Sequence, residues 1–349
     1  MAMQSINIDF KLFDSKLISL LSENDSIPLG LASGKMGFCI YFYCLSRLYD
    51  DKQYESVAES ILDDMFNNIS GYDLLDIPDG LSGIGLVINY LVKEKYVEGD
   101  INEILKDIDD VIFRKLSYPQ NCMLLPPLTI IHLLFYLNVR YGDLKAGSEQ
   151  KYLFQELIIE TINMLYDKFD PTFFDEPCFY SINYQFPLFI SVLSQTHRLG
   201  FYNCRINKIA EELSSKVLST FPVLQANKLS FLFGMSVLAN EIKLDGWNEH
   251  ITLLAKTLYI DSILTDELRD KNIFFENGFT SIYLLAERVK KYFPEQDMTC
   301  FKEKIRNRII NSQMWELLKD EDYFSQKAGL LNGYCGASLL LQLINRKYL

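Results

Sequence analysis

The sequence predicts an all-α protein built from seven helical hairpins, and three observations support that prediction. A glycine-anchored apolar segment recurs at intervals of roughly fifty residues along the 349-residue chain. Segments with the three- and four-residue periodicity of amphipathic helices lie between these copies. No segment alternates polar and apolar residues over the length of a strand. Because a closed ring of hairpins would use the whole chain, we expect one domain over residues 1–349.

The recurring segment is clearest in three copies. In each, a small polar residue precedes a glycine, a second glycine follows three positions later, and then comes an apolar run that indicates a helix buried on every side. The polar residue is a typical helix N-cap. The glycines predict close packing against neighbouring hairpins at the first helical turn. The copies lie at Gly30–Leu45, Asp79–Leu91 and Gly329–Leu343, with Ser33, Asp79 and Asn332 as the expected caps.

Weaker copies complete the repeat. Asn277–Leu285 carries Gly278 with Asn277 as its cap, and Phe233–Leu238 carries Gly234. The remaining copies place Pro126 and Tyr184 at the glycine position. The anchors are then residues 34, 80, 126, 184, 234, 278 and 333, with spacings between 44 (234 to 278) and 58 (126 to 184). Seven hairpins predict about fourteen helices.

An amphipathic helix is expected ahead of each anchor, with apolar residues on one face only. The longest irregular segment, Asp170–Tyr184, has room for a short hairpin. The expected amphipathic helices lie within Phe10–Leu21, Tyr54–Phe66, Ile101–Ile112, Leu153–Phe169, Ile206–Val217, Ile251–Leu264 and Phe301–Ile310.

Charge and cysteine content narrow the function classes. The net charge of −12 makes nucleic acid or an anionic membrane an unsuitable partner, whereas a cationic peptide is compatible with it. The seven cysteines are scattered without a CxxC pair, which is typical of reduced thiols. No apolar stretch is long enough to span a bilayer, and no secretory signal is recognisable. We therefore expect a cytoplasmic protein with no integral membrane segment.

The glycine-anchored repeat resembles the lanthionine synthetase C-like family over essentially the whole chain. The resemblance implies an α/α toroid, a double-layered barrel of helical hairpins. It also implies a chemistry, because active members use zinc to activate a cysteine thiolate, which adds to a dehydrated serine or threonine and closes a thioether ring. The zinc ligands of that family are a cysteine of the fifth hairpin and a Cys-His pair just before the glycine of the sixth.

Those ligand positions correspond here to Leu232, Glu276 and Asn277, none of which is a thiolate or an imidazole. A zinc site needs about four ligands, mostly Cys or His. The family's catalytic histidine also has no counterpart among His132, His197 and His250. The resemblance therefore implies a divergent member with no cofactor and no zinc-dependent cyclase activity.

The remaining candidate residues are polar groups expected at the mouth of the toroid. Acidic residues often lie at helix N-termini for electrostatic reasons alone. Asn277 can be interpreted simply as a helix N-cap. Cys39 and Cys335 fall inside buried helices, where a free cysteine behaves as a small apolar residue. No residue can be assigned a catalytic role. The candidate binding residues are Asp76, Asp79, Asp175, Glu176, Glu276 and Asn277.

Two functions fit these observations. The first is binding of a peptide, or of a modification enzyme, within a peptide-maturation pathway. The alternative is a carboxylate-dependent enzyme such as a glycoside hydrolase, since α/α toroids also house such enzymes and these use a pair of carboxylates. Whether the chain is an enzyme stays open at this point.

Overall fold

The structure is a computed structural model that describes residues 8–24, 26–118 and 124–347. Within those residues the regular structure is helical and contains no strand, which confirms the all-α class. Contacts divide the chain into two compact units. Unit 1 comprises Met1–Glu98, Leu268–Leu284 and Thr299–Leu349, and unit 2 comprises Gly99–Glu267 and Leu285–Met298. The single domain therefore stays a prediction.

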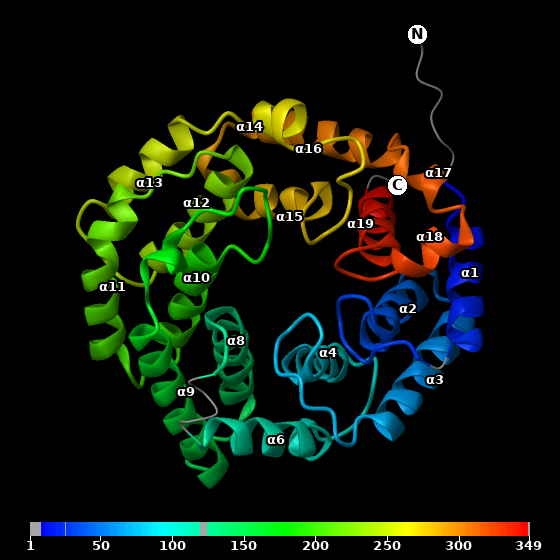
Figure 1. Cartoon of the computed structure of the whole chain (residues 1–349), viewed down its shortest axis with the longest axis horizontal. Coiled ribbons are helices and arrows are strands. Elements are labelled where there is room, and N and C mark those ends of the chain that lie inside the picture. The colour runs from blue at the N-terminus through cyan, green and yellow to red at the C-terminus, as the bar shows by residue number, and fades with distance from the viewer. Residues whose placement is uncertain (1–7, 25, 119–123, 348–349) are drawn as a thin grey trace. The chain divides into compact units, whose positions relative to one another are not determined.

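In unit 1 the apolar helix α2 (Lys35–Tyr49) contacts α19 (Tyr334–Lys347) and α4 (Leu81–Lys93) (Figure 1). The amphipathic helix α3 (Lys52–Asn68) packs along α2 and buries only one face, through Ala58, Ile61, Leu62 and Met65. In α2, by contrast, most side chains are buried. The other helices of this unit are α1 (Phe10–Glu23), α17 (Met314–Leu317) and α18 (Glu321–Gln326).

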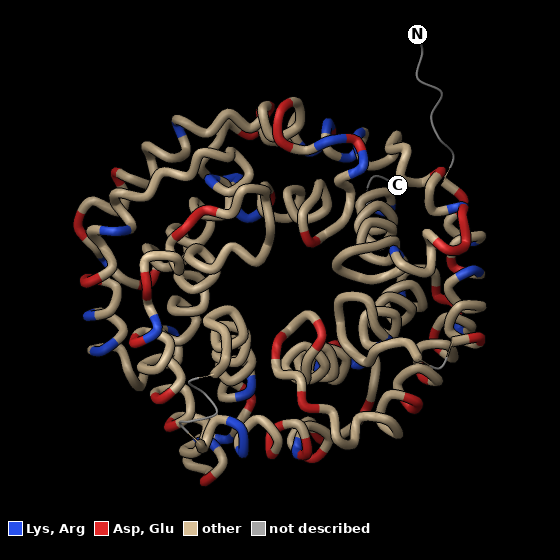
Figure 2. The backbone as a smooth tube through the Cα atoms, in the orientation of Figure 1, with Lys and Arg blue, Asp and Glu red and all other residues tan. Residues whose placement is uncertain are grey.

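Unit 2 has two layers. The apolar helices α8 (Pro127–Asp143), α10 (Gln185–Arg198) and α12 (Gln225–Ala239) lie side by side, with α10 in the middle (Figure 1). The helices that cover them carry many more charged residues than these three do (Figure 2). These covering helices are α6 (Lys106–Leu116), α9 (Glu149–Asp167), α11 (Asn203–Ser219) and α13 (Trp247–Lys256).

Short elements complete unit 2: α5 (Ile101–Ile104), the 3-10 helices η1 (Pro171–Phe174) and η3 (Lys290–Tyr292), α14 (Ile260–Ser262) and the π-helical turn η2 (Ile263–Glu267). Helices α15 (Phe279–Val289) and α16 (Glu295–Ile310) each contribute residues to both units. Every helix in the described residues is too short or too polar to span a membrane.

A buried aspartate ties a covering helix to an apolar helix in each unit. In unit 1, Asp14 of α1 accepts hydrogen bonds from the hydroxyls of Tyr41 (2.6 Å), Tyr54 (2.9 Å) and Tyr334 (2.9 Å), which lie on α2, α3 and α19. Burial raises the pKa of the Asp14 carboxyl. One carboxylate therefore joins four helices.

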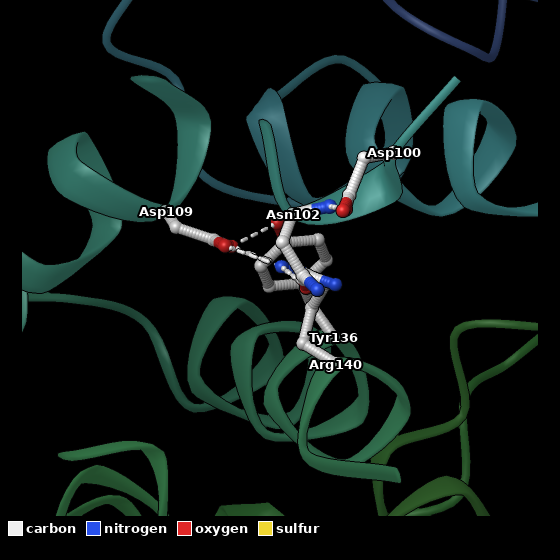
Figure 3. A network of polar contacts seen from close by, with 5 residues as sticks. All are labelled: Asp100, Asn102, Asp109, Tyr136 and Arg140. Atoms are coloured by element: carbon white, nitrogen blue, oxygen red, sulfur yellow. Dashed lines mark hydrogen bonds and ion pairs between the residues drawn. The ribbon is translucent and has the colours of Figure 1, made fainter. Parts of the chain in front are cut away.

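In unit 2, Asp109 of α6 accepts from the Tyr136 hydroxyl at 2.6 Å and from the Arg140 guanidinium at 2.7 Å (Figure 3). Arg140 also donates to Asn102 Oδ1 at 3.1 Å. The Asp109–Tyr136 and Asp14–Tyr41 pairs are both separated by 27 residues. Hairpins of both units thus repeat the same aspartate–tyrosine contact.

Six of the seven predicted anchors lie immediately before a helix. Residues 34, 80, 126, 184, 278 and 333 directly precede α2, α4, α8, α10, α15 and α19. The predicted caps Ser33 and Asp79 are wrong by one position, because Gly34 and Gly80 are themselves the N-caps and have extended backbone. A glycine there makes no side-chain cap, so the first-turn N–H groups must find other partners.

The fifth anchor is wrong. Gly234 lies inside α12, which begins at Gln225 with Leu224 as its N-cap. A Cβ on Gly234 would lie 2.7 Å from the carbonyl oxygen of Pro187 on α10, so this glycine allows two helices to approach closely. Glycine serves both helix starts and helix contacts, and the local sequence does not distinguish them.

Three further expectations need correction. Asp170–Tyr184 forms η1 and turns rather than a hairpin of strands. The helix expected over Ile251–Leu264 ends at Lys256, and a short helix and a π-turn follow. The short helices α17 and α18 were not expected.

Candidate functional site

The loops that precede α2, α4, α15 and α19 are joined by main-chain hydrogen bonds within unit 1. The carbonyl of Pro78 accepts from the N–H groups of Leu31 (2.8 Å) and Ala32 (2.7 Å). The carbonyl of Ala32 in turn accepts from Leu331, and that of Leu331 accepts from Glu276. Four loops thus form one connected band, named here the unit 1 loop band.

Close backbone approach explains two of the glycines in this band. A Cβ on Gly30 would lie 2.6 Å from Asp79 Cα, and one on Gly329 would lie 2.3 Å from the carbonyl oxygen of Ala32. Ser33 and Asn332 hydrogen-bond to each other through their side chains, at 2.9 Å between Asn332 Nδ2 and Ser33 Oγ. The expected cap Asn332 is therefore paired with another loop of the band.

Asp76 and Asp79 lie together at the start of α4. The carboxylate of Asp76 accepts from the backbone N–H of Asp79 at 2.8 Å, and the Asp76 carbonyl accepts from Gly80 and Gly83. Burial and the neighbouring Asp76 charge raise the pKa of the Asp79 carboxyl. Asp76 therefore has a structural use, whereas the Asp79 side chain lies at the surface.

Glu276 and Asn277 precede α15. Glu276 belongs to the band through its main chain, and its side chain is partly exposed. Asn277 is exposed. The structure thus brings together four of the six candidate residues in the unit 1 loop band, and it assigns Asp175 and Glu176 to unit 2.

In unit 2, two glutamates occupy the N-terminus of α12. Glu176 accepts from the backbone N–H groups of Val223 (2.7 Å) and Leu224 (2.9 Å). Glu267 accepts from those of Gln225 and Ala226. A carboxylate at a helix N-terminus is electrostatically favourable, so this helix start is filled by the protein's own anions.

Polar groups with incomplete hydrogen bonding surround these glutamates. Asn227 donates through Nδ2 to Glu176 at 3.0 Å. Its buried Oδ1 has no hydrogen-bond partner among the described residues. The buried hydroxyl of Tyr184 likewise has none there. Lys228 is 4% exposed, donates to the Thr257 carbonyl at 3.3 Å and lies over the Phe221 ring, with Nζ 4.5 Å from the ring centroid. Burial lowers the pKa of its ammonium group.

Glu176 was among the candidate binding residues predicted from the sequence, whereas Glu267 and Asn227 were not. Glu267 lies 41 residues after Ala226 in the sequence, at the end of a π-helical turn that no sequence pattern predicted. A cap supplied from another segment leaves no local signal, unlike the short-range caps that sequence patterns capture.

The residues at the expected zinc positions do not fit a zinc ion. Leu232 lies inside α12 and is fully buried, and hydrocarbon cannot ligate. Glu276 and Asn277 supply oxygen only, whereas zinc sites in proteins rest mainly on thiolate and imidazole. With the corrected start of α12, the residues just before that helix are Phe221, Pro222, Val223 and Leu224, and none of their side chains carries a ligand atom.

The buried thiols and imidazoles lie within packed helices, whereas Cys178, Cys204 and Cys300 are exposed. Burial raises the pKa of the Cys39 and Cys335 thiols well above the ordinary value. His250 donates a hydrogen bond from Nε2 to the Thr220 carbonyl at 3.1 Å, and burial lowers the pKa of its imidazole. His132 is buried on α8. Across the part of the chain that the structure describes, no three His, Cys, Asp or Glu side chains are grouped as a metal site.

The architecture is that of the lanthionine synthetase C-like fold, an α/α toroid. Among solved structures the chain is similar to nisin cyclase, with a TM-score of 0.68 over 97% of this chain and 94% of that one. The sequence identity is 13%, so the likeness establishes the fold. No protein-family model matches the chain, and no curated protein sequence matches it. The fold expected from the resemblance is thereby confirmed.

Proposed function

We propose that this protein is a divergent lanthionine synthetase C-like protein that binds a peptide or a modification enzyme in a peptide-maturation pathway. In this proposal it does not close thioether rings with zinc. The observation that carries the proposal is the shared fold over 97% of the chain, combined with Leu232, Glu276 and Asn277 at the expected ligand positions. The fold supplies the binding scaffold, and the side chains lack the donors for thiolate activation.

The alternative, a carboxylate-dependent enzyme, has weaker support. Such an enzyme needs two carboxylates that face a substrate across a pocket. Glu176 and Glu267 instead accept main-chain hydrogen bonds at α12. Asp76 accepts one at the start of α4. These carboxylates organise loops, which favours binding over acid–base catalysis.

The test uses the dehydrated form of a short cysteine-containing precursor peptide, which is to be sought among the genes that neighbour this protein's own. We expect the purified protein to bind that peptide in a calorimetric titration. We also expect the peptide's free thiols to persist, as counted by alkylation and mass spectrometry, with and without added zinc. Nisin cyclase with its own substrate is the positive control for ring closure. Absence of binding would contradict the proposed binding function. Zinc-dependent loss of the peptide's thiols would contradict the proposal that the protein does not close thioether rings.

A further inference from the structure

Three loops of unit 2 are held together at the N-terminus of α12, and we call them the three-loop surface: residues 170–184, 219–227 and 257–267. Glu176 joins the first loop to the second through Val223 and Leu224. The third loop is joined to the second where Tyr259 N–H donates to Gln225 Oε1 at 3.0 Å, and again where Glu267 accepts from Ala226 N–H at 2.9 Å. The loops therefore present their outward side chains on one framework.

Each of the three loops exposes a large apolar side chain. Phe179 is 84% exposed, Val223 is 81% exposed and Tyr259 is 68% exposed. Single exposed apolar residues are common, whereas exposed apolar groups that lie together mark interaction sites. The hydrogen bonds between these loops place the three residues on one framework. Aromatic side chains are also enriched in protein interfaces.

The charge of these loops is one-sided. They contain six acidic residues, Asp170, Asp175, Glu176, Asp261, Asp266 and Glu267, and no Lys or Arg. Glu176 and Glu267 are committed to α12, whereas the side chains of Asp175 and Asp266 are exposed. Lys228 donates a hydrogen bond to the Thr257 carbonyl, and its side chain is buried. Lys216 contacts the first loop, with Nζ 5.2 Å from the Phe174 ring.

From this pairing of apolar side chains with exposed carboxylates, we propose that the three-loop surface docks a cationic peptide segment whose Lys or Arg residues alternate with apolar ones. The apolar residues of the segment would cover Phe179, Val223 and Tyr259, and its cations would face Asp175 and Asp266. This inference rests on the proposed peptide-binding function and names the class of peptide. Opposite charge across an interface selects the partner and speeds association.

The probe is a short fluorescent peptide that alternates Lys with Leu, and the matched control peptide carries Glu in place of Lys. Titrations by fluorescence anisotropy compare the parent protein with two double variants, Phe179→Ser with Val223→Ser, and Asp175→Lys with Asp266→Lys. These side chains are exposed, so the variants should fold, which circular dichroism checks. The matched variants on α9 are Tyr152→Ser, at a residue that is 62% exposed, and Glu156→Lys with Glu160→Lys, at exposed residues.

We expect the parent to bind the Lys peptide more tightly than the Glu peptide, and more weakly as salt rises. The serine variant should lose roughly tenfold in affinity, which corresponds to about 1.4 kcal/mol. The lysine variant should reverse the preference, and the α9 variants should match the parent. Equal binding of both peptides, no binding of either, or unchanged binding by the loop variants would overturn the proposal.

The dehydrated precursor peptide used to test the proposed function separates this inference from that function. If the parent binds the precursor and the loop variants bind it equally well, the three-loop surface is wrong while the binding role stands. If the parent does not bind the precursor but binds the Lys peptide through these loops, the surface stands and the maturation role fails.

Discussion

Gly83 has no room for a side chain, because a Cβ there would lie 1.9 Å from the carbonyl oxygen of Ile77. A Cβ on Gly336 would lie 2.0 Å from the carbonyl oxygen of Leu330, and one on Gly37 would lie 2.2 Å from that of Leu31. In each case the obstacle is the carbonyl six residues earlier, in the loop that leads into the same helix. From the sequence we expected contacts with neighbouring hairpins. Such contacts are the nearest ones at Gly30 and Gly329, and at Gly37 the Leu330 side chain comes second, at 3.1 Å.

The first prediction follows from that geometry. Gly83→Ala should destabilise the protein by about 2 kcal/mol or more, because the methyl group must displace backbone and overpacking typically costs about 1–3 kcal/mol. The control is Gly142→Ala in α8, where nothing lies within 4 Å of the added Cβ. That variant should gain up to about 1 kcal/mol in helix propensity. Urea unfolding of both decides it, and a Gly83→Ala variant as stable as the parent would contradict the packing argument.

The second prediction concerns the buried Asp14. Its pKa is raised in the folded state, so the fold favours the protonated carboxyl. The stability it contributes is therefore present below its unfolded pKa and is lost as pH rises through the folded value. Compared with Asp14→Asn, the parent should be relatively more stable at acidic pH than at neutral pH. Thermal melts of both proteins across that range test the sign, and a pH-independent difference would show that Asp14 does not titrate in this window.

At the scale of helices, the Asp109–Arg140 ion pair fixes α6 to α8 with both side chains almost fully buried. The guanidinium nitrogen Nη1 of Arg140 has no hydrogen-bond partner among the described residues, so the hydrogen bonding of the pair is incomplete. Removing one member of such a pair strands a buried charge, whereas replacing both removes the desolvation penalty.

The third prediction uses this asymmetry. Arg140→Met should destabilise the protein by about 3–5 kcal/mol, since Asp109 is then left buried without its cation. The double variant Asp109→Leu with Arg140→Met should recover most of that loss. Equilibrium denaturation of the two variants is the measurement. A double variant that is no more stable than Arg140→Met would mean that the pair is needed for its hydrogen bonds to Tyr136 and Asn102.

The helices themselves could be predicted from sequence because their signals are local. Apolar periodicity located α3 and α11, and the glycine anchors located the starts of α2, α4, α15 and α19. The misplaced fifth anchor and the missed caps of α12 have a common cause, which is that the deciding contact is distant in sequence. Gly234 packs against Pro187, and α12 is capped by Glu176 and Glu267 from remote loops. The ion pair of Arg140 also shows no local pattern.

For the whole molecule, the fourth prediction is that the purified protein carries no stoichiometric zinc. Leu232, Glu276 and Asn277 lack the thiolate and imidazole donors that zinc prefers. Elemental analysis after purification without chelator is the measurement. About one zinc per chain would refute the prediction and would show that other residues supply the ligands.

Unit 1 is discontinuous, which sets an order of events during synthesis. Helix α2 is complete early, yet its neighbour α19 and the Tyr334 partner of Asp14 come at the other end of the sequence. At typical translation rates of about 5–20 residues per second, the apolar surface of α2 stays without these partners for about 15–60 s. Unit 2 consists of Gly99–Glu267 and Leu285–Met298, and both segments are synthesised before α19. We therefore expect nascent chains to acquire protease resistance first in the middle of the sequence, and to need a chaperone most for their earliest helices.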